Sequence, residues 1–147
     1  YAILSQSNRF KAGVAIDGVT DFVGFFSQFD PTSRGYDGIE HEKSVNWAIA
    51  QRSDFTDAPF RDYAQYTNKS PLFYGDRINT PLLLAHGEYD IRASAGQAGQ
   101  LFYMLYSQNK TARLLRYWGE NHSISLSAAN VRNLLDETIS WLEKYVK

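Results

Sequence analysis

Apolar residues recur with two different periods in the second half of the chain. Residues Pro81 to Ala85 form a continuous apolar run, which is too short for a helix and typical of a parallel strand covered on both faces. A second predicted strand covers Thr111 to Tyr117. Helical spacing follows each strand, over Ser94 to Ser107 and over Ser127 to Lys147. The order strand, helix, strand, helix predicts an α/β fold with a right-handed crossover.

The same spacing predicts which face of each helix is apolar. In the first helix this face comprises Ala98, Leu101, Phe102 and Leu105. In the last helix it comprises Val131, Leu134, Leu135, Leu142 and Tyr145. We expect both faces to be covered by the sheet.

The first half of the chain has a weaker pattern. Tyr1 to Ser7 is typical of the end of a helix, and the apolar run from Lys11 to Val19 predicts another buried strand. Turn residues between aromatic clusters predict an irregular segment from Thr20 to Arg61, with a helical piece over Glu42 to Ala50. One aromatic cluster there is expected in the core, in a domain contact or in a specificity pocket: Phe22, Phe25, Phe26 and Phe29.

Composition narrows the classes of protein. The chain has 147 residues, a net charge of −1 and no cysteine, which excludes disulfides and thiolate sites. Balanced charge favours neither a nucleic acid nor an anionic membrane as partner, and no apolar run approaches the roughly 20 residues that span a bilayer. No signal peptide is visible, and the compartment stays open between cytoplasm, periplasm and secretion. Without repeats or linkers, residues 1–147 are interpreted as one domain or part of one.

Polar residues follow the two predicted strands of the second half. His86 to Asp90 lies beyond the first strand, and Trp118 to His122 lies beyond the second. Functional groups of open parallel sheets gather just beyond the carboxyl ends of the strands. We therefore expect Asp90 and His122 to meet, with the carboxylate orienting the imidazole.

Other polar residues have structural explanations. His86 is expected to be packed and hydrogen-bonded at the strand end, and His41 to be a solvated residue at a helix start. Glu120 is expected to orient its loop by hydrogen bonding rather than lie in solvent. Asp17 and Asp21 are expected to hold turns rather than touch a substrate. The three histidines lack the spacing of metal ligands, so we predict no metal and no cofactor.

Two stretches, SPLFYGDRINTPLLLAHGEYD and RLLRYWGENH, with Gln97 between them, resemble the catalytic domain of the prolyl oligopeptidase family. The acylaminoacyl-peptidase and dipeptidyl-peptidase branches are the most similar. The resemblance covers most of Ser70 to Lys147, and it extends more weakly to Lys11–Val19 and Thr20–Phe22. It implies an α/β-hydrolase fold, usually accompanied by a β-propeller, for which this chain shows no sequence.

The resemblance also implies roles for individual residues. Asp90 would be the acid of a catalytic triad and His122 its general base, in the order Ser, acid, His of α/β-hydrolases. Arg92 stands where several family members bind a backbone carbonyl of the substrate. Ala93 stands where the family has Val. The implied activity is that of a serine peptidase that hydrolyses peptides through an acyl-enzyme.

The nucleophile of this pattern is missing from the 147 residues. No serine lies in G-x-S-x-G, because Ser33 and Ser94 have only the later glycine. In the family the motif precedes a segment that resembles Tyr1 to Gly13. We therefore expect the chain to be the C-terminal part of a catalytic domain whose N-terminal half and propeller are absent, and to be inactive alone.

Two other functions stay open. A carboxylesterase would share the same fold and triad. The chain could also be a non-catalytic association module or part of a pseudo-enzyme, neither of which needs a catalytic triad. In each case a sheet without its earlier strands has an exposed edge, so we expect a homo-oligomer that covers this edge.

Overall fold

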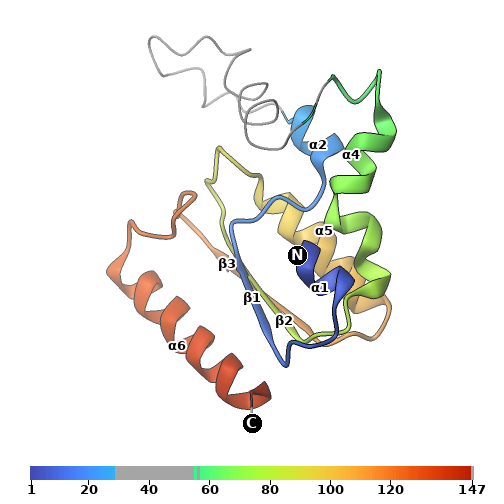
Figure 1. Ribbon diagram of the computed structural model, residues 1–147. Helices are drawn as coiled ribbons and strands as arrows, with labels where there is room; N and C mark the ends of the chain where they lie inside the picture. The colour runs from blue at the N-terminus through green and yellow to red at the C-terminus, as the bar shows by residue number, and fades with distance from the viewer. Residues whose placement is uncertain (29–54, 56, 147) are drawn as a thin grey trace, which may run out of the picture.

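The computed structural model describes residues 1–28, 55 and 57–146. Its centre is a parallel sheet of three strands, β1 (Gly13–Ile16), β2 (Leu82–Gly87) and β3 (Ala112–Tyr117), in the order β1-β2-β3 (Figure 1). All three strands are predicted from the sequence. The structure thus confirms the α/β pattern.

Strand β2 is central, and all six of its residues are buried. In register, Leu82 pairs with Gly13 of β1 and Ala112 of β3, and Ala85 pairs with Ile16 and Leu115 in the same way. A strand covered on both faces needs apolar residues at successive positions, which explains the continuous run from Leu82.

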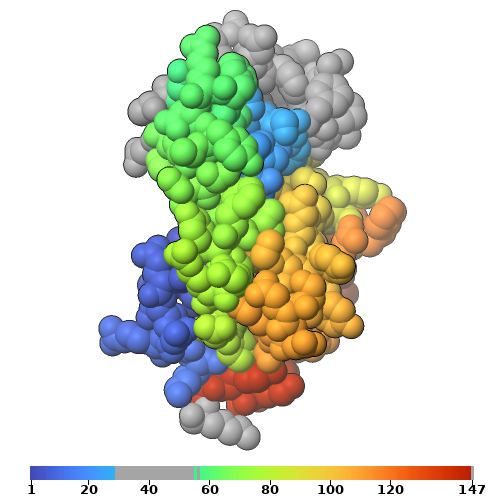
Figure 2. All heavy atoms as spheres, turned by 90° about the vertical axis from the view of Figure 1, so that its right-hand side faces the viewer, coloured from blue at the N-terminus to red at the C-terminus, as the bar shows by residue number. Residues whose placement is uncertain are grey.

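Helices cover both faces of the sheet (Figure 1). One face carries α1 (Ala2–Gln6), η2 (Pro71–Arg77) and α5 (Ala95–Ser107), and the other carries α6 (Ala128–Tyr145). Figure 2 shows the side where η2 and α5 lie next to each other. No helix in the described part of the chain is long and apolar enough to cross a membrane.

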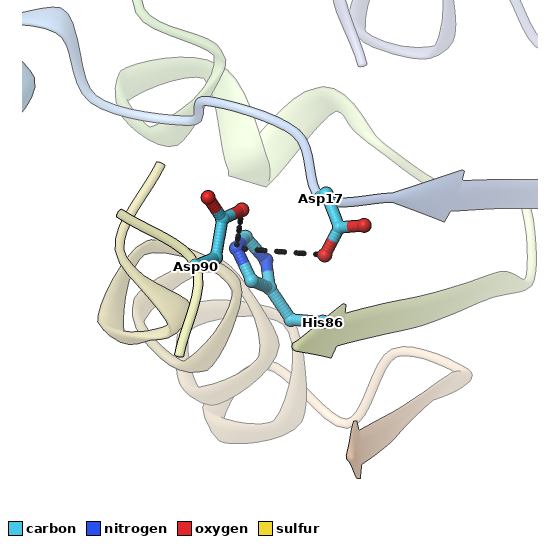
Figure 3. Close-up of side chains that lie close together, drawn as sticks. All are labelled: Asp17, His86 and Asp90. Atoms are coloured by element: carbon cyan, nitrogen blue, oxygen red, sulfur yellow. Dashed lines mark hydrogen bonds and ion pairs between the residues drawn. The ribbon is translucent and has the colours of Figure 1, made fainter. Parts of the chain in front are cut away.

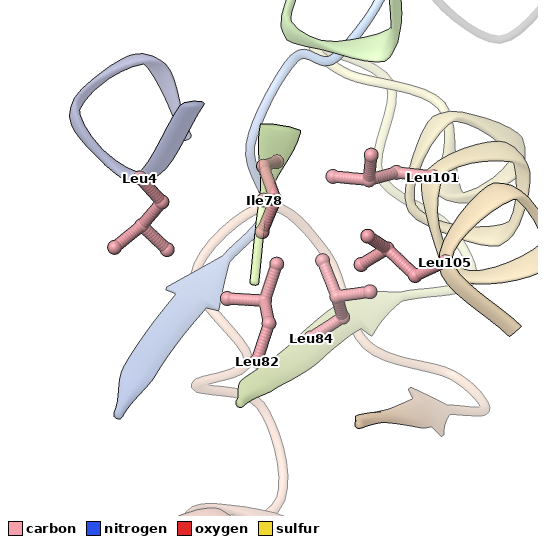
Figure 4. Close-up of a cluster of buried hydrophobic side chains, with 6 residues drawn as sticks. All are labelled: Leu4, Ile78, Leu82, Leu84, Leu101 and Leu105. Carbon is pink, nitrogen blue, oxygen red and sulfur yellow. The ribbon is translucent and has the colours of Figure 1, made fainter. Parts of the chain in front are cut away.

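The main core lies between the sheet and the helices of the first face (Figure 4). Its buried members are Leu4, Ile78, Leu82, Leu84, Leu101 and Leu105. A second cluster lies on the α6 side and consists of Ala85, Tyr117, Ile124 and Leu134. Because side chains alternate along a strand, β2 contributes to both clusters.

The expected buried face of α6 is wrong in part. Leu134 is buried, but Leu135 is 57% exposed and Leu142 is 38% exposed, whereas Trp141 is buried. The helix therefore has two apolar stripes and covers the sheet with only one of them. The second stripe, which includes Ile139, has no covering element in the described residues.

The segments before Ser70 are shorter than expected or partly outside the described residues. Strand β1 spans only Gly13–Ile16 of the predicted 11–19, because Asp17 takes a positive φ of 51° and ends it. The described residues that follow form two short helices, α2 (Phe22–Phe26) and α4 (Tyr63–Lys69). Helix α2 lies in the segment expected to be irregular, so that expectation is wrong there; Asp21 caps its start.

The aromatic cluster is confirmed as a core for the part that the structure describes. Phe22, Phe25 and Phe26 pack around the buried Phe55 and Tyr66. The expectations for Phe29, for His41 and for the helical piece over 42–50 lie outside the described residues.

Candidate active site

The carboxyl ends of β2 and β3 bring two loops into contact. The backbone N–H of Tyr89 donates to the carbonyl oxygen of Glu120 at 2.8 Å. Gly87 makes this approach possible: a Cβ there would lie 2.2 Å from the carbonyl oxygen of Asn121 and 2.6 Å from that of Glu120. Only glycine therefore fits where the loops meet.

Asp90 lies in the first loop, and its carboxylate is buried and fully hydrogen-bonded. Its Oδ1 accepts from the backbone N–H groups of Arg92 at 2.8 Å and Ala93 at 3.0 Å. Its Oδ2 lies 2.8 Å from Nδ1 of His122 and 3.0 Å from Nε2 of His86. Burial by itself would raise the pKa of Asp90, but these hydrogen bonds hold the pKa below its ordinary value.

His122 lies in the second loop, so the expected meeting of Asp90 and His122 is confirmed. The Nδ1 atom of the imidazole faces the buried carboxylate, while 36% of the side chain is exposed. Its Nε2 is therefore the nitrogen left to reach a reacting group. An imidazole oriented in this way by a buried acid has the geometry of a general base.

His86 lies behind this pair, at the end of β2, and is completely buried. Its Nε2 lies 3.0 Å from Oδ2 of Asp90 and 3.8 Å from Oδ1 of Asp17 (Figure 3). The same nitrogen lies 2.7 Å from the carbonyl oxygen of Ala93. Burial lowers the pKa of His86, but the hydrogen bonds to Asp90 and Ala93 and the charge of Asp17 outweigh it and raise the pKa above its ordinary value. The expectation of a packed, hydrogen-bonded histidine is confirmed.

Asp17 is the functional-site neighbour that sequence reasoning missed. It was expected only to hold a turn, and its Oδ1 does accept from the backbone N–H of Gly87 at 3.0 Å. It is also buried against His86, and burial raises the pKa of its carboxyl group. No local pattern in the sequence places it there, because the contact depends on β1 ending at Asp17 and lying beside β2.

A metal ion is a poor fit to this cluster. Asp17, His86 and Asp90 can offer ligand atoms within 4.8 Å of one another. However, the carbonyl oxygen of Ala93 can only accept, so Nε2 of His86 must carry a hydrogen toward it. Nε2, the nitrogen of His86 that faces both carboxylates, therefore has no lone pair for a metal.

Glu120 fixes the loop that carries His122, as expected. Its buried carboxylate accepts from the backbone N–H groups of Leu126 and Ser127, both at 2.9 Å, and from Nδ2 of Asn130 at 2.8 Å. The Asn130 side chain and these backbone groups lower the pKa of Glu120. The loop is thereby attached to the first turn of α6.

The remaining candidates lie nearby. Arg92 directs its backbone N–H to Asp90, and its side chain is exposed and makes no hydrogen bond or ion pair with the other described residues. Asp21 caps α2 by accepting from the backbone N–H of Val23 at 2.9 Å, so the expectation that it holds a turn is confirmed. The structure thus brings Asp90 and His122 together, whereas the side chain of Arg92 contacts neither of them by a hydrogen bond.

Comparison with known sequences identifies a family that matches the whole chain and relatives that match all or part of it. A model described as the prolyl oligopeptidase family matches residues 1–147. The uncharacterized peptidase YuxL of Bacillus subtilis (strain 168) is 29% identical over 146 residues, which cover 98% of this chain and 20% of that protein. The acylamino-acid-releasing enzyme of Sus scrofa is 35% identical over 63 residues, 43% of this chain and 9% of the enzyme. The chain spans a fifth or less of the length of these relatives.

Solved structures share the fold. A Mycobacterium tuberculosis puromycin-hydrolyzing peptidase matches with a TM-score of 0.80 and 22% identity over 98% of this chain and 20% of that chain. The uncomplexed acylaminoacyl peptidase of Pyrococcus horikoshii matches with a TM-score of 0.75 and 20% identity over 98% of this chain and 22% of that chain.

Proposed function

Because the chain belongs to the prolyl oligopeptidase family, we propose that it is the C-terminal part of the catalytic domain of a serine peptidase. Its fold is of the α/β-hydrolase type, as expected from the sequence. The observation that carries the proposal is the hydrogen bond of 2.8 Å between Asp90 and Nδ1 of His122, at the carboxyl edge of the sheet.

The pair has the chemistry that acyl transfer requires. Asp90 holds Nδ1–H of His122, so the Nε2 lone pair takes the proton of a serine hydroxyl as the hydroxyl attacks a peptide carbonyl. The buried carboxylate stabilises the imidazolium that forms. His122 then gives the proton to the leaving amine, and water hydrolyses the acyl-enzyme with the same histidine as base.

The serine of this mechanism has to come from outside the 147 residues, which contain no G-x-S-x-G. The chain alone is therefore expected to be inactive. In the longer protein, the oriented imidazole of His122 would stand next to the serine, and peptides would be the substrate class.

The exposed guanidinium of Arg92 is suited to bind a substrate carbonyl beside the pair. Arginine can offer two parallel N–H donors, and Arg92 has no partner in the described structure that competes for them. We expect Arg92→Ala to lower kcat/KM in the longer protein about 10- to 100-fold, mainly through KM. Steady-state kinetics with a peptide substrate measure this.

The matched control is Arg113→Ala. Arg113 is another exposed arginine, but it pairs with Glu137 near the start of β3, away from the carboxyl edge. Its replacement should leave both kinetic constants within twofold. If Arg92→Ala also leaves kcat and KM within twofold, Arg92 does not bind a substrate carbonyl.

The proposal itself is tested in the full-length protein that contains this chain. His122→Ala should lower kcat for peptide hydrolysis by several orders of magnitude and should slow labelling of the active serine by a fluorophosphonate. Ester and amide substrates should be compared, because a carboxylesterase would hydrolyse only the ester. Near-normal peptide hydrolysis by the variant would refute the base assignment.

A further inference from the structure

His86 donates from Nε2. All three atoms near this nitrogen are oxygens: the carbonyl oxygen of Ala93, Oδ2 of Asp90 and Oδ1 of Asp17. A carbonyl oxygen can only accept, so the hydrogen must be on Nε2. The other ring nitrogen, Nδ1, is buried and has no hydrogen-bond partner in the described structure, so in the neutral ring it is the nitrogen without a hydrogen.

His122 approaches the same carboxylate with its other ring nitrogen. Its Nδ1 donates to Oδ2 of Asp90 at 2.8 Å, and the single Nε2–H of His86 is shared between that same oxygen at 3.0 Å and the carbonyl oxygen of Ala93 at 2.7 Å. Two imidazoles of opposite tautomer thus converge on one oxygen. One ring is completely buried and the other is partly exposed.

The two oxygens of Asp90 are held from different directions. Backbone N–H groups of Arg92 and Ala93, which follow Asp90 in the same loop, hold Oδ1. His86 is on strand β2, and its ring is enclosed by the core, so it holds Oδ2 from the sheet. With both oxygens held, the carboxylate has no freedom to turn away from His122.

We propose that His86 is a positioning residue for the catalytic acid, and that its Nε2–H keeps Oδ2 of Asp90 directed at His122. This inference rests on the proposed peptidase function. His86 does not touch a substrate, because none of its side chain is exposed.

Asp17 is the third group that faces Nε2 of His86, after Ala93 and Asp90. It faces His86 from the tip of β1 and is itself held by the backbone N–H of Gly87, the residue after His86. Its negative charge favours the polarised N–H of His86. The charged groups that face His86 in the described structure are thus Asp17 and Asp90, with His122 beyond the latter.

Two substitutions distinguish a role of His86 in positioning Asp90 from a role in packing alone. His86→Leu fills the space without a donor, whereas His86→Gln carries an amide N–H at a similar distance along the side chain. In the full-length protein we expect His86→Leu to lower kcat about 10- to 100-fold with KM within twofold, because displacing the acid misaligns the base and not the substrate. We expect His86→Gln to recover most of kcat.

The control for lost stability is Leu105→Ala. Leu105 is buried in the core cluster of the first face and belongs to no part of the proposed site. Its variant should keep kcat at temperatures where it is folded. A folded His86→Leu enzyme with kcat within twofold of wild type overturns the inference, and so does a folded His86→Gln enzyme as slow as His86→Leu.

Two further results distinguish a failure of the proposed function from a failure of the positioning role of His86. If His122→Ala is active, the proposed function fails as a whole; if only His86→Leu is active, the positioning role fails alone. If the His86 variants do not fold, long-range ¹H–¹⁵N spectra of this 147-residue chain decide. A hydrogen on Nε2 of His86 supports the inference, whether the ring is neutral or charged, and a neutral ring with its hydrogen on Nδ1 alone overturns it.

Discussion

Buried carboxylates at the strand ends are held by N–H donors. Asp90 accepts hydrogen bonds at both oxygens, and Glu120 does so as well. The pKa of each group is therefore below its ordinary value. Asp17 differs: burial raises its pKa, and its Oδ2 has no hydrogen-bond partner in the described structure. Carboxyl groups at the same edge of the sheet thus have pKa values that are shifted in opposite directions.

The lowered pKa of Glu120 makes stability depend on pH. A carboxyl group whose pKa is lowered by folding stabilises the fold above its unfolded-state pKa of about 4.3, and this contribution is lost as the pH falls through the folded-state value. Glu120→Gln should therefore be less stable than wild type at pH 7, and the difference should shrink below about pH 4. Urea denaturation between pH 7 and pH 2 measures this, and a difference that does not change with pH would contradict it.

Gly87 controls the approach of the two loops. Gly87→Ala places a Cβ against backbone atoms of Glu120 and Asn121, which cannot move aside as a flexible side chain would. We expect a loss of about 1–3 kcal/mol in the free energy of unfolding, at the upper end of this range because the atoms in the way belong to the backbone. The control is Gly99→Ala in α5, where an added Cβ meets nothing within 4 Å and should stabilise the helix by about 0.5–1 kcal/mol. Equal effects in denaturant titrations would count against the close approach.

The sequence predicted that Asp90 and His122 meet, but only part of what surrounds them. Asp90 and His122 follow strongly apolar strands, so their place at one edge came from the strand pattern alone. The contact of Asp17 with His86 depends on β1 lying next to β2 and on a single residue with positive φ, and neither is visible in a local pattern. The choice of tautomer depends on the carbonyl oxygen of Ala93, which only coordinates can place.

At the scale of elements, the periodicity of apolar residues predicts helix α6 but not which of its faces is buried. Its start, its length and its apolar character were predicted. The sequence contains two apolar stripes, however, and periodicity does not say which one a neighbour covers. Leu134 is 8% exposed, while Leu135, one position along, is 57% exposed.

These adjacent leucines give a matched test of packing. Leu134→Ala removes side-chain atoms from the cluster with Ala85 and Tyr117, so we expect a loss of about 2–4 kcal/mol in the free energy of unfolding. Leu135→Ala should change it by less than about 0.5 kcal/mol in dilute solution. Chemical denaturation of the two variants compares them directly. A larger effect for Leu135 would mean that its stripe is covered.

At the scale of the whole molecule, the sheet has an open edge. Strand β1 pairs only with β2 among the described strands. The N–H groups of Gly13 and of Asp17, the residue after β1, donate to the carbonyl oxygens of Pro81 and Ala85. By alternation, the N–H groups of Val14 and Ile16 face away from β2. An unpaired edge of this kind promotes pairing with another chain.

We therefore expect the 147-residue chain to form a dimer or higher oligomer through β1. Val14→Pro should shift it toward the monomer, because proline removes the outward N–H and leaves the hydrogen bonds to β2 in place. Light scattering after gel filtration measures the mass of both forms. A wild-type chain with the mass of a monomer would contradict the expectation.

The account as a whole depends on the contact between Asp90 and His122, and the protonation of His122 tests it most directly. Long-range ¹H–¹⁵N spectra of this chain report which ring nitrogen carries the hydrogen. We predict a hydrogen on Nδ1 of His122, held by the carboxylate, and its loss in Asp90→Ala. A hydrogen on Nε2, or a spectrum that Asp90→Ala leaves unchanged, would show that the acid does not orient this imidazole.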